Sequence, residues 1–145
     1  MAAPRLDPNM TLAALNARTE GTLPGWYGFE VMALAPGRLV GRIHIRPEML
    51  APNGFLHAAS VIALADTSAG FATIAHLPEG ATSFTTLELK SNFLGTQTEG
   101  ELRCVASAAH TGRSSQVWDA EVTGADGRCL ALFRCTQMIL WPRAG

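Results

Sequence analysis

The most distinctive chemical group in this sequence is the carboxylate of Asp66. Between Met49 and Pro78 it is the only side chain with a formal charge. Burying an ionised carboxylate is costly unless it is paired or hydrogen-bonded, because burial disfavours the charged form. Buried acids of this kind are candidates for catalytic bases or nucleophiles. The alternative is a structural aspartate whose charge is balanced by a neighbouring arginine or by backbone amides.

His57 is the second candidate, nine residues before Asp66. If one helix contained both residues, a rotation of about 100° per residue would place them on opposite faces. A site that uses both side chains is therefore difficult to build within one chain. At a two-fold interface, the turn of one subunit can face the acid of the other. The alternative for His57 is a core or helix-capping histidine.

The segment from Pro52 to Ser60 leads into the start of an apolar helix. The first amides of a helix have no partner within it and lie at the positive end of the helix dipole. Such amides can stabilise a developing oxyanion, although every helix start has this property. Gly70 follows Asp66 by four residues on the same helix face. A glycine there costs about 1 kcal/mol relative to alanine, which indicates close packing by a ligand or by another element.

No motif for nucleotide, serine-nucleophile or metal chemistry is present. The sequence has no G-x-G-x-x-G, Walker or G-x-S-x-G pattern. The histidines at positions 44, 57, 76 and 110 lack metal-ligand spacing, so we expect no metal and no separate cofactor. A formal net charge of −1 without a basic patch argues against nucleic acid as a partner.

The elements around these residues predict an α+β domain. A leading helix, two strands and a long buried helix are expected at 9–21, 26–34, 38–46 and about twenty residues from Leu56. Four further segments have strand chemistry: 82–94, 99–110, 114–123 and 128–140. Strands on both sides of a helix favour a largely antiparallel sheet bent around that helix. One such sheet leaves part of the helix uncovered, which predicts a partner subunit.

The bulk composition indicates one cytoplasmic domain. We divide the 145 residues into an N-terminal segment, 1–24, and a main domain, 25–145. The long apolar stretch carries an acid near its middle, which costs about 2.5–3.5 kcal/mol on membrane-insertion scales, so we reject a membrane span. The three cysteines lack disulfide or zinc spacing, and the N-terminus lacks the apolar core of a secretory signal.

Taken together, the residues from Asn53 to Ala72, NGFLHAASVIALADTSAGFA, resemble the hallmark of the phenylacetate-degradation-type and 4-hydroxybenzoyl-CoA-type thioesterases. In that pattern, Gly-x-x-His-Gly-Gly is followed by an Asp or Glu nine residues after the histidine. Gly54, His57 and Asp66 fall at the matching positions. The resemblance implies the hotdog fold, in which a curved antiparallel sheet wraps around a long central helix.

Three later segments extend this resemblance. They are TTLELKSNFLG from Thr85, EGEL from Glu99 and HTGRS from His110, and they are similar to the strands that follow the helix in these families. The resemblance covers about residues 25–140, nearly the whole domain.

The resemblance implies hydrolysis of acyl-CoA thioesters, with short-chain, medium-chain or aryl acyl groups, to a free acid and coenzyme A. In these families the acid attacks the thioester or activates water, the amide after the histidine polarises the carbonyl, and the two groups come from different subunits. By position, the catalytic roles fall to Asp66, His57, Ala58 and Thr86. Contacts with the substrate or coenzyme A fall to Asn53, Gly54, Thr67, Gly70, Gly112, Arg113 and Ser114.

Two departures from the family pattern stand in the same segment. Ala58 and Ala59 replace the Gly-Gly pair, which keeps the backbone amide but crowds the acyl path. Ala51 replaces the usual Asn or Gln, and Asn53 is the nearest polar substitute. The alternative function is therefore a non-catalytic acyl-CoA-binding hotdog protein, against which the retained acid at position 66 argues. The expected assembly is a homo-oligomer, either a dimer or a homotetramer built of two dimers.

Overall fold

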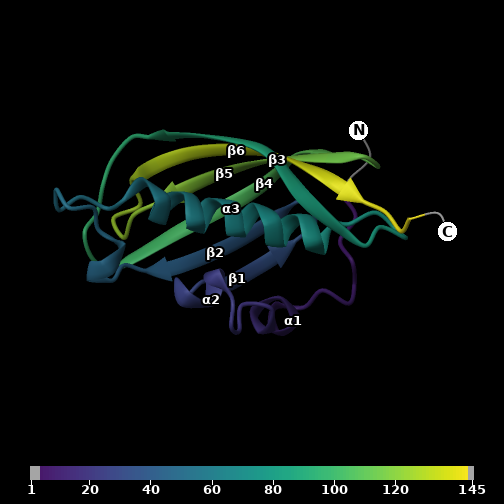
Figure 1. Cartoon of the computed structure of the whole chain (residues 1–145), viewed down its shortest axis with the longest axis horizontal. Coiled ribbons are helices and arrows are strands. Elements are labelled where there is room, and N and C mark those ends of the chain that lie inside the picture. The colour runs from purple at the N-terminus through teal and green to yellow at the C-terminus, as the bar shows by residue number, and fades with distance from the viewer. Residues whose placement is uncertain (1–3, 144–145) are drawn as a thin grey trace.

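A six-stranded antiparallel sheet curves around one long helix in the computed structural model, which describes residues 4–143 (Figure 1). The helices are α1 (Leu12–Ala17), α2 (Leu23–Trp26) and α3 (Ala58–Ala75), with a 3₁₀ turn at Pro47–Met49. The strands are β1 (Glu30–Ala35), β2 (Arg38–His44), β3 (Ser83–Phe93), β4 (Glu101–Thr111), β5 (Ser115–Thr123) and β6 (Cys129–Leu140).

The sheet order explains how the helix is enclosed. The strands are arranged β1-β2-β4-β5-β6-β3, so that β1 and β3 form the two edges. Four of the five strand pairs contain a register shift, and bulges of this kind bend and twist strands. The curvature lets one face of the sheet cover α3. The prediction of an α+β hotdog architecture is confirmed.

The four segments after the long helix were predicted within about two residues of the observed strands β3 to β6. The start of the first strand was wrong. Residues from Trp26 were expected to be extended, but Trp26 ends α2 and β1 begins at Glu30. Pro24 stands in the first turn of α2, where its fixed φ favours a helix start. Its carbonyl then accepts a hydrogen bond from Phe29 N at 2.9 Å.

The N-terminal segment packs on the rest of the domain. Thr11 caps α1, and its side chain accepts a hydrogen bond from Ala14 N. Leu15 is fully buried in the core. Asn16 Oδ1 accepts a hydrogen bond from Val31 N at 2.7 Å, and Asn16 Nδ2 donates one to Val31 O at 3.1 Å. The side chain therefore pairs with the edge strand β1 as a neighbouring strand would. The boundary between residues 24 and 25 stays a prediction.

Helix α3 has the length and apolar composition of a membrane span, yet it is the core helix of this domain, with eleven of its 18 residues buried. It keeps a stripe of exposed or partly exposed residues that the sheet does not cover: Ala58, Ala59, Ile62, Ala63, Asp66 and Thr67. This stripe agrees with the expectation that the sheet of one chain leaves part of the helix open.

His76 ties the C-terminal end of α3 to the turn between β1 and β2. Its Nε2 accepts a hydrogen bond from Gly37 N at 2.8 Å, so the proton of the neutral ring is on Nδ1, which donates to Ala72 O at 2.7 Å. The ring is buried beside Trp118. Burial lowers the pKa of His76 below its usual 6.5, because a charged ring would lose water and face the Gly37 N–H with a second donor.

The folded chain is therefore expected to lose stability in mild acid through His76. The pKa of His76 is lower in the folded state than in the unfolded state. The contribution of the neutral ring to folding stability is therefore complete above pH 6.5 and is lost as the pH falls through the lowered pKa. Melting temperatures of the parent and of His76→Gln at about pH 7.5 and about pH 5 check this. Gln cannot titrate, so the variant should cost about 1–3 kcal/mol at the higher pH and show a smaller loss on acidification. An equal loss in both proteins would contradict the assignment.

Candidate active site

Asp66 lies in the middle of α3, is partly exposed, and has no hydrogen-bond or ion-pair partner within residues 4–143. Its Oδ1 is the only buried side-chain oxygen or nitrogen in residues 4–143 that has no hydrogen-bond partner. Burial raises the pKa of Asp66 above its ordinary value, since desolvation favours the neutral acid. The described chain thus supplies neither an arginine nor an amide to balance this carboxylate. An unpaired carboxylate with a raised pKa is the kind of group that accepts a proton in catalysis.

Strand β3 lies against α3 where Phe84 meets Gly70. A Cβ added to Gly70 would lie 3.1 Å from the ring atom Cζ of Phe84, so these two residues mark where the strand and the helix touch. β3 runs antiparallel to α3 (Figure 1). Two residues along a strand cover about 6.7 Å, and four residues along a helix cover about 6 Å. The step from Phe84 to Thr86 has about the same length as the step from Gly70 back to Asp66, and we infer from this that Thr86 lies near Asp66.

Gln137 joins this group from β6, the neighbour of β3. Thr86 Oγ1 donates a hydrogen bond to Gln137 Oε1 at 2.8 Å. Gln137 Nε2 in turn donates to Cys135 Sγ at 3.3 Å. Burial, and then the charge of Asp66, raises the pKa of Cys135 to about 12, which indicates that the thiol lies near the carboxylate. The sequence analysis missed Gln137. The available signal was a polar residue on the inward-facing register of an otherwise apolar strand.

The start of α3 presents a free backbone amide at Ala58. His57 is the cap of the helix, and its Nδ1 accepts a hydrogen bond from Ala59 N at 2.9 Å. Within residues 4–143, Ala58 N has no hydrogen-bond acceptor. The amide of Ala58 therefore points outward at the positive end of an 18-residue helix, where it can stabilise an oxyanion. His57 holds the turn, which is the capping role weighed as an alternative in the sequence analysis.

The turn before His57 is ordered by its own hydrogen bonds. Asn53 Oδ1 accepts from Phe55 N at 3.3 Å. Gly54 has a φ of 84°, in the left-handed region that favours glycine. Ala51 N donates to Phe55 O at 2.7 Å, and Gly54 N donates to Ala51 O at 2.9 Å. Both predicted site residues of this turn therefore have a structural role, and a role in substrate contact stays a prediction.

Ala58 and Asp66 cannot act on one thioester within a single chain. They are eight residues apart in the same helix, which corresponds to about 12 Å along the helix axis. To act on one thioester, each group must lie within about 3–3.5 Å of the reacting atoms that it contacts, and a separation of this size is too large for that. The condition for the predicted opposite-face relation, one helix containing both His57 and Asp66, is not met, because His57 is the cap that precedes α3. The separation along the axis leads to the same requirement for a second chain.

The turn between β4 and β5 carries the remaining predicted residues, Gly112, Arg113 and Ser114, near the C-terminal end of α3. Gly112 and Arg113 line a cavity there with His76. The Arg113 guanidinium lies 4.2 Å from the ring centroid of Trp141. The structure does not bring this turn to Asp66 within one chain, and its contact with coenzyme A stays a prediction. By contrast, Thr67 and Gly70 lie on α3 within one turn of Asp66.

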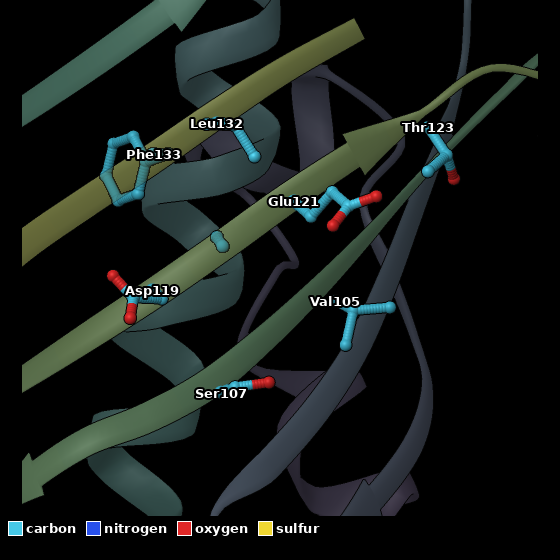
Figure 2. A pocket seen from close by; sticks show the side chains of 8 residues that line it. Val105, Ser107, Asp119, Glu121, Thr123, Leu132 and Phe133 are labelled. Carbon is cyan, nitrogen blue, oxygen red and sulfur yellow. The ribbon is translucent and has the colours of Figure 1, made fainter. Parts of the chain in front are cut away.

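A hollow of about 520 Å³ lies on the outer face of the sheet (Figure 2). It is lined by Val105, Ser107, Asp119, Ala120, Glu121, Thr123, Leu132 and Phe133. Helix α3 lies behind the sheet in this view, so the hollow is on the face of the sheet opposite to α3. In this hollow, Asp119 Oδ1 and Oδ2 already accept hydrogen bonds from Arg134 Nε and Nη2, at 2.5 and 2.7 Å.

In residues 4–143, no three His, Cys, Asp or Glu side chains are grouped to hold a metal ion.

Comparison with known proteins places this geometry among thioesterases. The sequence model of the thioesterase superfamily matches residues 53–131, from the turn before α3 to β6. The chain is 29% identical over 131 residues to the 1,4-dihydroxy-2-naphthoyl-CoA hydrolase of Escherichia coli, covering 90% of this chain and 96% of the relative. It is 32% identical over 119 residues to the proofreading thioesterase EntH of Klebsiella pneumoniae, covering 82% and 86%.

Solved structures agree. A mutant thioesterase from Pseudomonas aeruginosa superposes with a TM-score of 0.88 at 25% identity, covering 93% of this chain and 97% of that one. The PaaI protein from the phenylacetic acid degradation operon of Escherichia coli superposes with a TM-score of 0.78 at 20% identity, covering 90% and 96%. The second likeness concerns the fold alone.

Proposed function

Because this chain belongs to the thioesterase superfamily, we infer that it is an enzyme that hydrolyses acyl-CoA thioesters to a free acid and coenzyme A. The observation that carries the inference is the carboxylate of Asp66, which is unpaired in the described chain, has a pKa raised by burial, and lies in the stripe of α3 that the sheet leaves open. Coenzyme A is part of the substrate, and we propose no separate cofactor. The free thiols of Cys104, Cys129 and Cys135 suit a reducing compartment, and we propose the cytoplasm.

The active site is proposed to form between two copies of the chain. β3 is a long edge strand with exposed apolar side chains, Leu87 at 58% and Phe93 at 47% exposure. An exposed apolar edge of this kind favours pairing with another strand. A second copy that pairs there and covers the open stripe of α3 can bring its Ala58 amide to Asp66. Two such dimers would make the homotetramer, the second of the two assemblies that the sequence analysis left open, and light scattering distinguishes it from a dimer.

An aryl acyl group is the proposed substrate class. Phe71 belongs to the core, 5.3 Å from the ring of Phe29, and Phe55 and Phe93 are largely exposed. Phe84 alone of these rings lies against Gly70, one helical turn from Asp66. A flat ring beside the reacting carboxylate suits a planar acyl group. A relative with 29% identity is named as the hydrolase of an aryl thioester, 1,4-dihydroxy-2-naphthoyl-CoA.

The test of this function is thiol release from a panel of short-chain, medium-chain and aryl acyl-CoAs. We expect hydrolysis, with the largest kcat/KM for the aryl members. Tight binding of coenzyme A without release of thiol from any member would support the non-catalytic binding protein instead.

Gly70→Ala is expected to change the acyl preference and to leave the fold intact. The new methyl group would lie 3.1 Å from Phe84, so that the ring must move, while alanine favours the helix by about 1 kcal/mol. We expect kcat/KM for aryl-CoA to fall about tenfold, with a smaller change for acetyl-CoA. Steady-state kinetics with both substrates measure this. An equal loss on both would show that the Phe84 ring does not contact the acyl group.

A further inference from the structure

We propose that Gln137 is a positioning residue that makes Thr86 hold the attacking water as a hydrogen-bond acceptor, so that Asp66 acts as a general base. This inference rests on the proposed hydrolysis. It assigns a role to Gln137, which lies outside the motif at residues 53–72. For Asp66 it favours activation of water over direct attack on the thioester.

The hydrogen-bond inventory of Thr86 carries the first step. A hydroxyl has one proton to donate and two lone pairs that accept. The Thr86 proton is committed to Gln137 Oε1 at 2.8 Å. Because the donor is used, Thr86 can only accept a further hydrogen bond. A water molecule in front of this exposed side chain must therefore donate to Thr86 Oγ1.

The orientation of Gln137 is fixed by its surroundings. Its side chain is fully buried, and its amide nitrogen donates to Cys135 Sγ. The Cys135 thiol stays protonated, because its pKa is raised to about 12. With the nitrogen directed to the thiol, the amide oxygen is left for Thr86. The buried amide of Gln137 therefore keeps the Thr86 hydroxyl as a donor to Gln137, so that Thr86 can act toward water only as an acceptor.

Asp66 completes the arrangement. Its buried Oδ1 lacks a donor in the described chain, and the helix–strand contact between Gly70 and Phe84 leads us to place Thr86 facing it. A water between the two residues donates one hydrogen to Asp66 and the other to Thr86 Oγ1. Both hydrogens are then held, and a lone pair of the water oxygen is free to point at the thioester carbonyl.

The reaction follows with atoms and charges balanced. The water oxygen forms a bond to the carbonyl carbon, its proton passes to Asp66, and the carbonyl π pair moves to the oxygen held by the partner's Ala58 amide. When the carbonyl re-forms, the C–S bond breaks and its electron pair stays on sulfur. Asp66 returns its proton to the sulfur. The net change is thioester plus water to carboxylic acid plus coenzyme A thiol.

A double-mutant cycle tests the link between the two residues. Thr86→Val and Gln137→Met each remove one partner at similar volume, and each should lower kcat about tenfold with little change in KM. Because Gln137 acts through Thr86, the double variant should also fall about tenfold. Additive loss, about a hundredfold, would overturn the proposal.

The ratio of methyl ester to acid formed in the presence of methanol is a second measurement. A purely structural role of Gln137 would leave this ratio unchanged. Methanol has one O–H and cannot donate to both Asp66 and Thr86. In buffer containing methanol, the parent should form acid in preference to methyl ester. Thr86→Val and Gln137→Met should raise the ester-to-acid ratio about fivefold, and Thr86→Ser should keep the parent ratio. If Gln137→Met fails to fold, an unchanged ratio in Thr86→Val still refutes the proposal.

Gln116→Met is the matched control. Gln116 is the neighbour of Gln137 on β5 and is equally buried. Its amide nitrogen donates a hydrogen bond to His76 O, and its amide oxygen accepts one from Trp118 Nε1. We expect a lower melting temperature and an unchanged ester-to-acid ratio. A raised ratio in this control would assign the effect to loss of packing and overturn the proposal. Absence of hydrolysis by the parent would refute the proposed function as well, whereas an active parent with an additive cycle refutes this inference alone.

Discussion

Replacing Asp66 with asparagine is expected to lower kcat/KM for acyl-CoA hydrolysis by about 10²–10⁴-fold, the usual contribution of a general base. The amide has the shape of the carboxylate but cannot take the proton from water. In the parent, kcat/KM should fall in acid as the pH drops through the pKa of Asp66, which burial raises. Thiol-release assays across pH measure both effects. Turnover equal to the parent would rule out Asp66 as the catalytic group.

The same variant is expected to be more stable than the parent at neutral pH. The pKa of Asp66 is higher in the folded chain, so its contribution to stability is present below its ordinary 3.8 and is lost as the pH rises through the raised value. Asparagine has no charge to desolvate. The melting temperature of Asp66→Asn should therefore exceed that of the parent, and more so at neutral than at acid pH. A lower melting temperature would mean that the carboxylate has a stabilising partner.

Asp126→Asn is the matched control. Asp126 lies in the β5–β6 turn, and its hydrogen bonds with Arg128 lower its pKa. The sign for stability is therefore opposite to that of Asp66: its contribution is present at neutral pH and is lost on acidification. This variant should keep its activity and should not gain stability.

Ala58→Pro is expected to lower kcat by about 10²–10³-fold, the effect of losing one oxyanion donor. Ala58 is the first residue of α3, a position where proline is favoured. His57 before it has φ −66° and ψ 135°, which a following proline allows. The substitution therefore removes one N–H that has no partner in the described chain and leaves the helix start in place. Leu12→Pro, at the first residue of α1, is the control and should keep activity.

Mixing the two inactive variants tests the two-chain site. In a heterodimer of Asp66→Asn and Ala58→Pro, one site combines the intact Asp66 of one chain with the intact Ala58 amide of the other. Random pairing makes half of the dimers mixed, and about a quarter of all sites intact. Co-expression should therefore restore about a quarter of parent activity. If both groups belonged to one chain, no site would be repaired and activity would stay at the level of the single variants.

The sequence alone was sufficient to predict the long helix and strands β3 to β6, and to single out the carboxylate of Asp66. Strands β3 to β6 could be predicted because alternating apolar residues and turn pairs such as Asp126-Gly127 are local signals. The long helix and its lone charge at Asp66 were visible for the same reason. The resemblance to thioesterases then implied the oxyanion amide at Ala58. These features depend on residues that are close together in the chain.

Only the tertiary structure decided which of these residues meet. Gln137 reaches Thr86 because β6, the last strand, pairs with β3. These residues are 51 positions apart, and no periodicity in the sequence encodes that pairing. The same holds for the approach of Phe84 to Gly70 and for the distance between Asp66 and the turn at Gly112. Strand order and helix–sheet packing are settled by burial of the whole core, and that packing decides which side chains lie near Asp66.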